Sequence, residues 1–163
     1  MTKLVFITGA SSGIGQALAL RYYQAGYSLA LVARRTQEIK TWAVQHQISA
    51  DRYQIYSADV SVVDSIVAAG QQCLLYQGVP DVVIANAGIS IGMDSAVRDD
   101  LEVMARTFST NNLGLAATFH PFIGAMVQRR SRMSAMPSLR TGPRCPSQSS
   151  GRSASRWSRR SRR

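Results

Sequence analysis

The sequence contains two cysteines, no long apolar run, and no acidic residue after Glu102. Cys73 and Cys145 form neither a close pair nor a metal-binding spacing, so we expect no metal site, and a reducing, cytoplasmic location fits. Because no run of about 18 apolar residues occurs, we expect no membrane span. The first residues lead directly into a glycine-rich turn, so we expect no signal peptide.

Acidic residues are also missing from both ends of the chain. The formal net charge is +10, and all nine acids lie between Glu38 and Glu102. Residues 1–128 carry eight Lys or Arg against these nine acids, whereas residues 129–163 carry eleven Arg and no acid. Arg and Ser fill 21 of the last 35 positions, a composition that cannot bury a core. The sequence therefore predicts one folded domain at residues 1–128 and a disordered tail at residues 129–163.

The start of the chain has the pattern of a strand, a glycine turn and a helix. The apolar run Leu4–Ile7 is typical of a buried strand, and Thr8–Gly15 reads Thr-Gly-Ala-Ser-Ser-Gly-Ile-Gly. Apolar residues at helical spacing follow to about Tyr23, and Gly26 is the expected helix stop. Glycines let the backbone approach a phosphate, and a helix N-terminus favours an anion. Glycines also serve ordinary turns, but this order of elements favours nucleotide binding.

Three further strands are predicted, at Ser28–Ala33, Tyr53–Ser57 and Asp81–Ala85. Helices are expected at residues 37–47, 61–76 and about 99–129, the last with a break near Asn111. Ser61–Asp64 resembles a capping box at the start of the second of these helices. Strands that alternate with helices predict an α/β fold with a parallel sheet covered on both faces. The carboxyl ends of such strands meet at one edge, where ligands bind.

Polar residues or glycine follow every predicted strand. Arg34 and Arg35 stand where an acid would select the free 2′-hydroxyl of NAD, so they favour the 2′-phosphate of NADP. Two solvated arginines at a helix start are the alternative. Asp59 could accept a hydrogen bond from the adenine amino group, or it could serve a turn. The run Asn86-Ala87-Gly88 would let the backbone approach a cofactor closely, or it could form an ordinary turn.

Together these motifs resemble the short-chain dehydrogenase/reductase family. Thr8–Gly15 matches its cofactor motif, Asp59-Val60 its adenine-contact pair, Asn86-Ala87-Gly88 its Asn-Ala-Gly motif, and Asn111 with Gly114 its Asn-x-x-Gly on the following long helix. The resemblance covers residues 3 to about 128. It implies a truncated Rossmann-like, doubly wound parallel sheet with strand order 3-2-1-4.

The resemblance also implies the chemistry. The family transfers a hydride between a nicotinamide cofactor, here NADP with NAD less favoured, and a small alcohol or carbonyl substrate. Asn111 would be the structural and proton-relay asparagine of the catalytic tetrad. The residues implied at the cofactor are Gly9, Ser11, Ser12, Gly13, Ile14, Gly15, Arg34, Arg35, Asp59, Val60, Asn86, Ala87 and Gly88.

The rest of the family's catalytic machinery has no match. The family carries a serine on a fifth strand and then a Tyr-x-x-x-Lys, whose tyrosine acts as general acid or base. This chain has no tyrosine after Tyr76 and no lysine after Lys40. We therefore expect an oxidoreductase by family that is inactive as the chain stands, and a shift of reading frame near Arg129 would explain the abrupt change of composition.

Two other interpretations stay open. One is a non-catalytic NADP-binding module. The other is a nucleic-acid-binding protein that works through the Arg-rich tail, although only Trp157 supplies an aromatic there. A homo-oligomer of the family type would be compromised, because only one of the two helices through which the family pairs is present.

Overall fold

The computed structural model describes residues 2–129. Its main elements are β1 (Leu4–Thr8), α1 (Gly13–Gln24), β2 (Ser28–Ala33), α2 (Thr36–Gln45), β3 (Tyr53–Ser57), α3 (Val63–Tyr76), β4 (Val82–Ile84), α4 (Asp100–Phe108), α5 (Gly114–Phe119) and α6 (Ile123–Arg129). A short 3-10 turn, η1 (Ala50–Arg52), precedes β3, and a π-helix, η2 (Ser109–Leu113), joins α4 to α5. The bounds of β2 and β3 are those that the sequence predicts.

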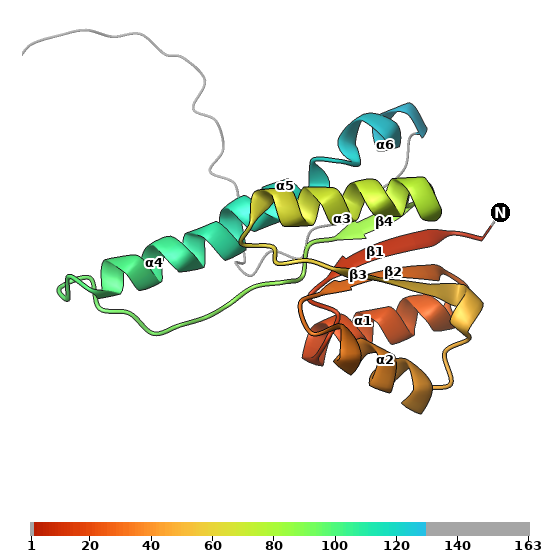
Figure 1. Ribbon diagram of the computed structural model, residues 1–163, viewed down its shortest axis with the longest axis horizontal. Helices are drawn as coiled ribbons and strands as arrows, with labels where there is room; N and C mark the ends of the chain where they lie inside the picture. The colour runs from red at the N-terminus through yellow and green to blue at the C-terminus, as the bar shows by residue number, and fades with distance from the viewer. Residues whose placement is uncertain (1, 130–163) are drawn as a thin grey trace, which may run out of the picture.

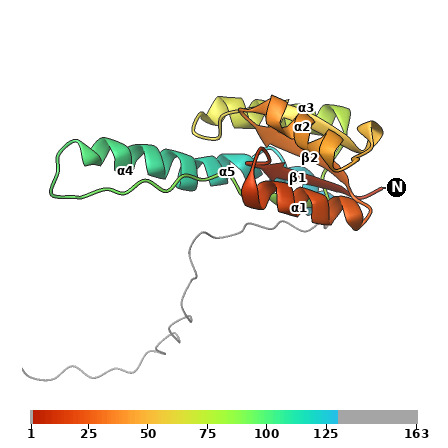
Figure 2. The same cartoon turned by 90° about the horizontal axis from the view of Figure 1, so that it is seen from below.

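The four strands form one parallel sheet in the order β3-β2-β1-β4, which confirms the predicted order. β1 lies in the middle and pairs with β2 on one side and β4 on the other. Helices α1 and α2 cover one face of the sheet, and α3, α5 and α6 cover the other (Figure 1). Figure 2 shows the same layers from below. The predicted α/β fold with both faces covered is confirmed.

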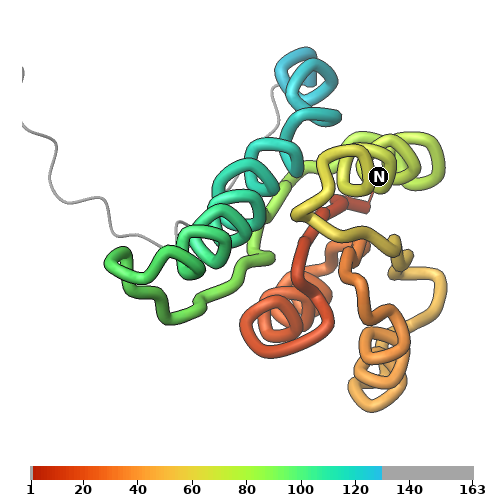
Figure 3. The backbone as a smooth tube through the Cα atoms, turned by 60° about the vertical axis from the view of Figure 1, so that its left-hand side comes forward, coloured from red at the N-terminus to blue at the C-terminus, as the bar shows by residue number. Residues whose placement is uncertain are grey.

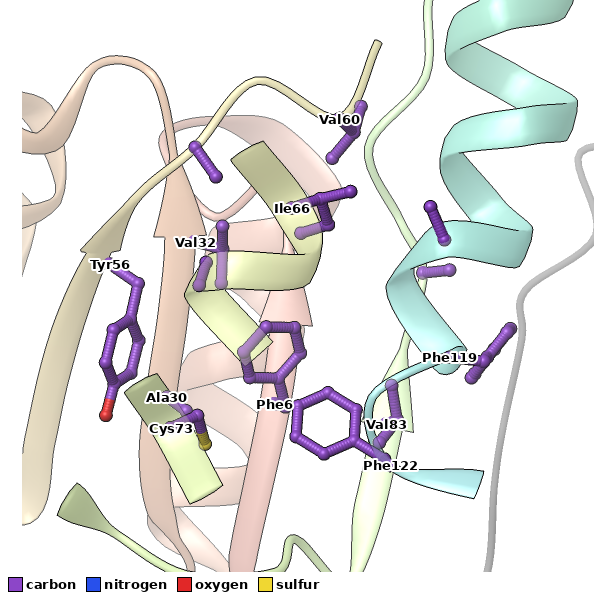
Figure 4. Packing of buried hydrophobic residues seen from close by; sticks show 14 of the residues in the cluster. Phe6, Ala30, Val32, Tyr56, Val60, Ile66, Cys73, Val83, Phe119 and Phe122 are labelled. Carbon is purple, nitrogen blue, oxygen red and sulfur yellow. The ribbon is translucent and has the colours of Figure 1, made fainter. Parts of the chain in front are cut away.

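The core is divided between the two faces because successive strand residues point to opposite sides. Val5 and Ile7 of β1 pack with Trp42 of α2 on one face. Phe6, between them in sequence, packs on the other face, where its ring meets that of Phe122 edge-on at a centroid distance of 4.8 Å (Figure 4). Since both faces are buried, the strands read as continuous apolar runs rather than as alternating patterns.

The helical region after β4 is interrupted twice. The predicted break near Asn111 is the π-helix η2, which widens the helix without ending it, so α4, η2 and α5 form one continuous rod (Figure 3). A second interruption, which the sequence analysis does not predict, is the turn at His120–Phe122 before α6. Gly70 of α3 makes room for that turn, since a Cβ there would lie 3.1 Å from Cβ of Pro121.

Helix α3 begins differently from the prediction. Its N-cap is Val62, and no side chain caps it. The Ser61 hydroxyl instead donates to Oδ1 of Asp59 at 2.7 Å. The capping-box prediction is wrong because Asp59, two residues earlier, already holds the serine side chain.

Two further observations concern the limits of the chain. The predicted tail lies outside the described residues except for Arg129, which ends α6 and forms an ion pair with Asp81 at 3.3 Å. No helix within residues 2–129 has the length and apolar character needed to cross a membrane.

Candidate functional site

The carboxyl ends of all four strands open into one cavity of about 590 Å³. It is lined by residues of the glycine turn, of the segments after β2, β3 and β4, and of α4 and η2. These are Gly9, Ser11, Ser12, Gly13, Ile14, Val32, Ala33, Arg34, Arg35, Ala58, Asp59, Val60, Ser61, Asn86, Ala87, Gly88, Ile89, Arg106 and Thr110. Of the predicted site residues, only Gly15 and Asn111 are not part of this lining. The structure thus brings together four segments that are far apart in the sequence.

The glycine turn is built by backbone conformation and by close approach. Gly9 and Gly13 have φ angles of 69° and 54°, in the left-handed region that favours glycine. Gly15 lies behind the turn, where a Cβ would come within 2.8 Å of the carbonyl carbon of Gly9. At Gly13 a Cβ would meet nothing within 4 Å, so the backbone is open toward the cavity. The turn therefore leaves room for a ligand on the side where α1 begins.

The first turn of α1 is suited to an anion. Its N-cap, Ser12, makes no side-chain capping hydrogen bond, so the side chain leaves the first backbone N–H groups uncapped. These groups and the positive end of the helix dipole favour a phosphate. A pyrophosphate group fits this cradle in charge and in space.

Thr8 connects the glycine turn to the segment after β4. Its hydroxyl oxygen accepts hydrogen bonds from the backbone N–H groups of Asn86 and Ala87, each at 3.1 Å. The Asn86 side chain returns the contact by donating to the Thr8 carbonyl at 3.1 Å. The Asn86 side chain, which the sequence predicts near a cofactor, thus helps to fix the segment after β4 against the glycine turn.

The two arginines after β2 have different surroundings. Arg34 forms an ion pair at 3.4 Å with Asp59, which follows the neighbouring strand β3, and the Arg34 side chain is 69% exposed. Arg35 forms an ion pair with Glu38 at 3.0 Å and donates a long hydrogen bond of 3.5 Å to the Ser11 hydroxyl. Arg35 therefore joins the glycine turn to the start of α2, with Ser11 beside it.

Asp59 stabilises a turn, which is one of the two roles that the sequence predicts for it. Its Oδ1 accepts hydrogen bonds from the backbone N–H and the hydroxyl of Ser61, at 3.0 and 2.7 Å. The hydrogen bond from the Ser61 hydroxyl, with help from the Ser61 backbone and Arg34, holds the pKa of the Asp59 carboxyl below its usual range. The Oδ2 atom faces Arg34 and the cavity, so the turn does not occupy the whole carboxylate.

Asn111 lies behind the cavity wall rather than on it. Its side-chain amide accepts a hydrogen bond from the Ile89 N–H and donates one to the Ile89 carbonyl. Ile89 does line the cavity. Seven lining residues were not assigned to the site from the sequence: Val32, Ala33, Ala58, Ser61, Ile89, Arg106 and Thr110. Arg106 and Thr110 lie four positions apart on the predicted helix and so share one of its faces, but the sequence alone does not show that this face meets the cavity.

A family model described as short chain dehydrogenase matches residues 3–135. The chain belongs to the short-chain dehydrogenase family. The cavity at the strand ends is therefore in the place where this fold holds a nicotinamide dinucleotide, at the carboxyl edge of the sheet beside the glycine turn.

Several relatives agree with this assignment. The chain is 35% identical over 137 residues to a Drosophila melanogaster protein named dehydrogenase/reductase SDR family protein 7-like, covering 79% of this chain and 40% of the relative. It is 33% identical to the NADPH-dependent pterin aldehyde reductase of Arabidopsis thaliana, covering 78% of this chain and 52% of the relative. Among solved structures, an alcohol dehydrogenase from the archaeon Thermococcus sibiricus, complexed with 5-hydroxy-NADP, is 28% identical with a TM-score of 0.72. That likeness covers 83% of this chain and 57% of the solved chain. The chain thus spans about half the length, or less, of the curated relatives it matches.

Proposed function

We propose that this chain is the NADP(H)-binding part of an oxidoreductase that interconverts a small alcohol and its carbonyl compound. The observation that carries the proposal is the convergence of a phosphate cradle and two arginines on one cavity. The NADPH-dependent pterin aldehyde reductase and the alcohol dehydrogenase complexed with 5-hydroxy-NADP support the choice of cofactor. The free thiol of Cys73 is compatible with a reducing, cytoplasmic location.

Each part of the cofactor has residues suited to it. The uncapped N-terminus of α1 and the glycine turn would hold the pyrophosphate. Asp59 and Val60 would hold the adenine, and the Asn86–Gly88 segment would lie along the middle of the dinucleotide. When bound, the cofactor supplies a hydride donor or acceptor. The residues of this chain bind and orient it.

Arg35 is better placed than Arg34 for the 2′-phosphate. It already contacts Ser11, so a guanidinium and a hydroxyl are together at one point of the rim. Both arginines are also paired with a carboxylate, Arg34 with that of Asp59 and Arg35 with that of Glu38. We infer that Arg35 and Ser11 form the main phosphate contact and that Arg34 contributes less, because Arg35, unlike Arg34, makes a hydrogen bond to a hydroxyl.

The chain as it stands should bind the cofactor without turning it over. It contains no Tyr-x-x-x-Lys, and both polar atoms of the Asn111 side-chain amide form hydrogen bonds with the Ile89 backbone. An amide has no proton that titrates near neutral pH, so Asn111 cannot replace a general acid. Catalysis would need groups that this sequence does not contain.

The experiment is a fluorescence titration of the full chain with NADPH and with NADH. A charge-assisted contact contributes about 1.5–3 kcal/mol, so NADPH should bind about tenfold tighter or more. Arg35→Ala should remove this preference, and Arg34→Ala should reduce it less. Equal affinities of the unmodified chain for NADPH and NADH would contradict the assignment of NADP.

A further inference from the structure

Arg106 lines the cavity at the strand ends from an element other than the glycine turn, the helix α4. It lies on α4, one helical turn before Thr110, which lines the cavity as well. Its backbone carbonyl accepts a hydrogen bond from the Thr110 hydroxyl at 3.0 Å, so the two residues are held in one turn of the helix. No motif of the sequence analysis includes Arg106, and its side chain has no part in the fold described above.

Arg106 is the one cavity arginine without an acidic partner within residues 2–129. Arg34 pairs with Asp59, and Arg35 pairs with Glu38. No carboxylate of the described residues lies within 4.0 Å of the Arg106 guanidinium. The acidic residues of α4, Asp100 and Glu102, lie in its first turn. Glu102 lies four positions before Arg106 on the same helix face but makes no ion pair with it, so Arg106 presents to the cavity a guanidinium that no described carboxylate holds.

The helical region that carries Arg106 is fixed against the segment after β3 by residues that follow α4. The Ser109 hydroxyl donates to the Ser61 carbonyl at 3.0 Å, which fixes η2 against that segment. Gly114 allows the same close approach, since a Cβ there would lie 3.3 Å from Cβ of Val60. The residues that follow α4 thus pack on Val60 and Ser61, and Arg106, three positions before Ser109, lines the same cavity as these residues.

We propose that Arg106 covers the adenine ring of the bound dinucleotide, with its planar guanidinium stacked on the face of the base. This inference rests on the proposed function, which places adenine at Asp59 and Val60. The phosphate groups have their own cradle at α1 and at Arg35, whereas no aromatic side chain lines the cavity within the described residues to stack on the base. A guanidinium supplies both a flat surface and a positive charge, and arginine stacks on nucleobases and aromatic faces in this way.

Stacking on adenine makes a distinctive prediction, because NADPH and NADH share the base and differ only at the 2′-position. Arg106→Ala should weaken binding of both cofactors by the same factor, roughly fivefold to tenfold on the scale of cation–π contacts. Arg35→Ala, by contrast, should weaken NADPH far more than NADH. The measurement is the Kd of the full chain for each cofactor by fluorescence titration.

Two further variants separate stacking from charge and from damage to the fold. Arg106→Lys keeps the charge but loses the plane, so it should recover only a small part of the affinity. Arg98→Ala removes an exposed arginine outside the cavity lining and should leave both Kd values unchanged. Thermal melts followed by circular dichroism should be the same for Arg106→Ala and the unmodified chain, because the Arg106 side chain is exposed.

Each other outcome overturns the inference in a recognisable way. Unchanged Kd values in Arg106→Ala would show that the side chain is only solvated. A loss confined to NADPH would make Arg106 a 2′-phosphate ligand. Full recovery by Arg106→Lys would mean that charge alone acts. If the unmodified chain bound neither dinucleotide, the proposed function itself would fail, whatever the variants did.

Discussion

The side-chain amide of Asn111 makes two hydrogen bonds to the backbone of Ile89, which lies 22 positions earlier in the chain. Oδ1 accepts from the Ile89 N–H and Nδ2 donates to the Ile89 carbonyl, each at 2.8 Å. The π-helix η2 carries Asn111, and Ile89 lines the cavity at the strand ends. The amide therefore ties the long helical region to the wall of the site.

Replacing Asn111 by Asp tests this connection. The carboxylate can accept from the Ile89 N–H but cannot donate to its carbonyl, so one backbone group loses its partner. We expect the free energy of unfolding to fall by about 1–3 kcal/mol and the affinity for NADPH to fall with it. Asn112→Asp, at the exposed neighbouring position, adds the same charge and should change neither quantity. Equal denaturant midpoints for the two variants would contradict a role of the Asn111 amide.

The sequence predicts the fold well because the strands are buried on both faces. A nearly continuous apolar run such as Ser28–Ala33 is typical of a strand in a parallel sheet that is covered on both faces. The observed strand β2 has the same bounds. The glycine turn is equally informative, since its spacing is tied to backbone conformations that other residues rarely adopt. The gathering of Arg34, Asp59 and Asn86 then follows from the rule that parallel strands end at the same edge.

Two of the features that the sequence did not predict depend on contacts between distant segments. Ser61 was predicted to cap α3, but in the structure its hydroxyl donates to Asp59 and does not cap the helix. The turn at His120–Phe122 requires the space that Gly70 leaves on another helix. Arg106 reaches the cavity because η2 packs on the Asp59–Ser61 turn. The contacts of Gly70 and Ser109 join segments far apart in the sequence and have no local signature, whereas Asp59 and Ser61 are two positions apart and form a local turn.

Gly15 should tolerate alanine much less than Gly124 does. Both glycines are helical, in α1 and α6, but a Cβ at Gly15 would strike the backbone of Gly9 and Ala10, whereas one at Gly124 meets nothing within 4 Å. We expect Gly15→Ala to cost about 1–3 kcal/mol of unfolding free energy and to disrupt the phosphate cradle. Gly124→Ala should be neutral or should stabilise by up to about 1 kcal/mol. Chemical denaturation compares them, and equal destabilisation would show that Gly15 is not a site of close approach.

The buried thiol of Cys73 should make the fold sensitive to alkali. Burial raises the pKa of this thiol from 9.0 to about 12, and burial also raises the pKa of Tyr56 beside it. A group whose pKa is raised in the folded state contributes stability below its unfolded pKa and loses it as pH rises toward the folded value. Between about pH 9 and pH 12 the unfolding free energy should therefore fall with a slope of up to about 1.4 kcal/mol per pH unit from Cys73.

Cys73→Ala should flatten that slope while lowering stability at neutral pH, because it leaves a small cavity. Cys145→Ser is the control for a cysteine outside the described residues, and the steep alkaline slope should persist in it. Denaturation at several pH values measures both effects. A slope that stays as steep in Cys73→Ala as in the unmodified chain would exclude the thiol as its source.

The chain as given should show no NADPH-dependent carbonyl reduction above background. General acid–base catalysis typically contributes about 10²–10⁴-fold, and no residue of this sequence can supply it in the family's manner. A family match that ends at residue 135, together with a composition that changes near Arg129, points to a change of reading frame in this interval. Because Arg129 still pairs with Asp81 at the edge of the sheet, the change should lie after its codon.

Translating the coding sequence beyond the codon for Arg129 in the two other frames should reveal an apolar strand that ends near a serine. A Tyr-x-x-x-Lys should follow it roughly a dozen residues later, where the tyrosine can act as general acid and the lysine can lower its pKa. The chain rebuilt in that frame should oxidise or reduce an alcohol/carbonyl pair with NADP(H). Its Tyr→Phe variant should still bind NADPH with unchanged Kd but lose turnover, which separates chemistry from cofactor binding. If neither frame encodes the motif, residues 129–163 are genuine, and the chain is better understood as a dinucleotide-binding module without catalysis.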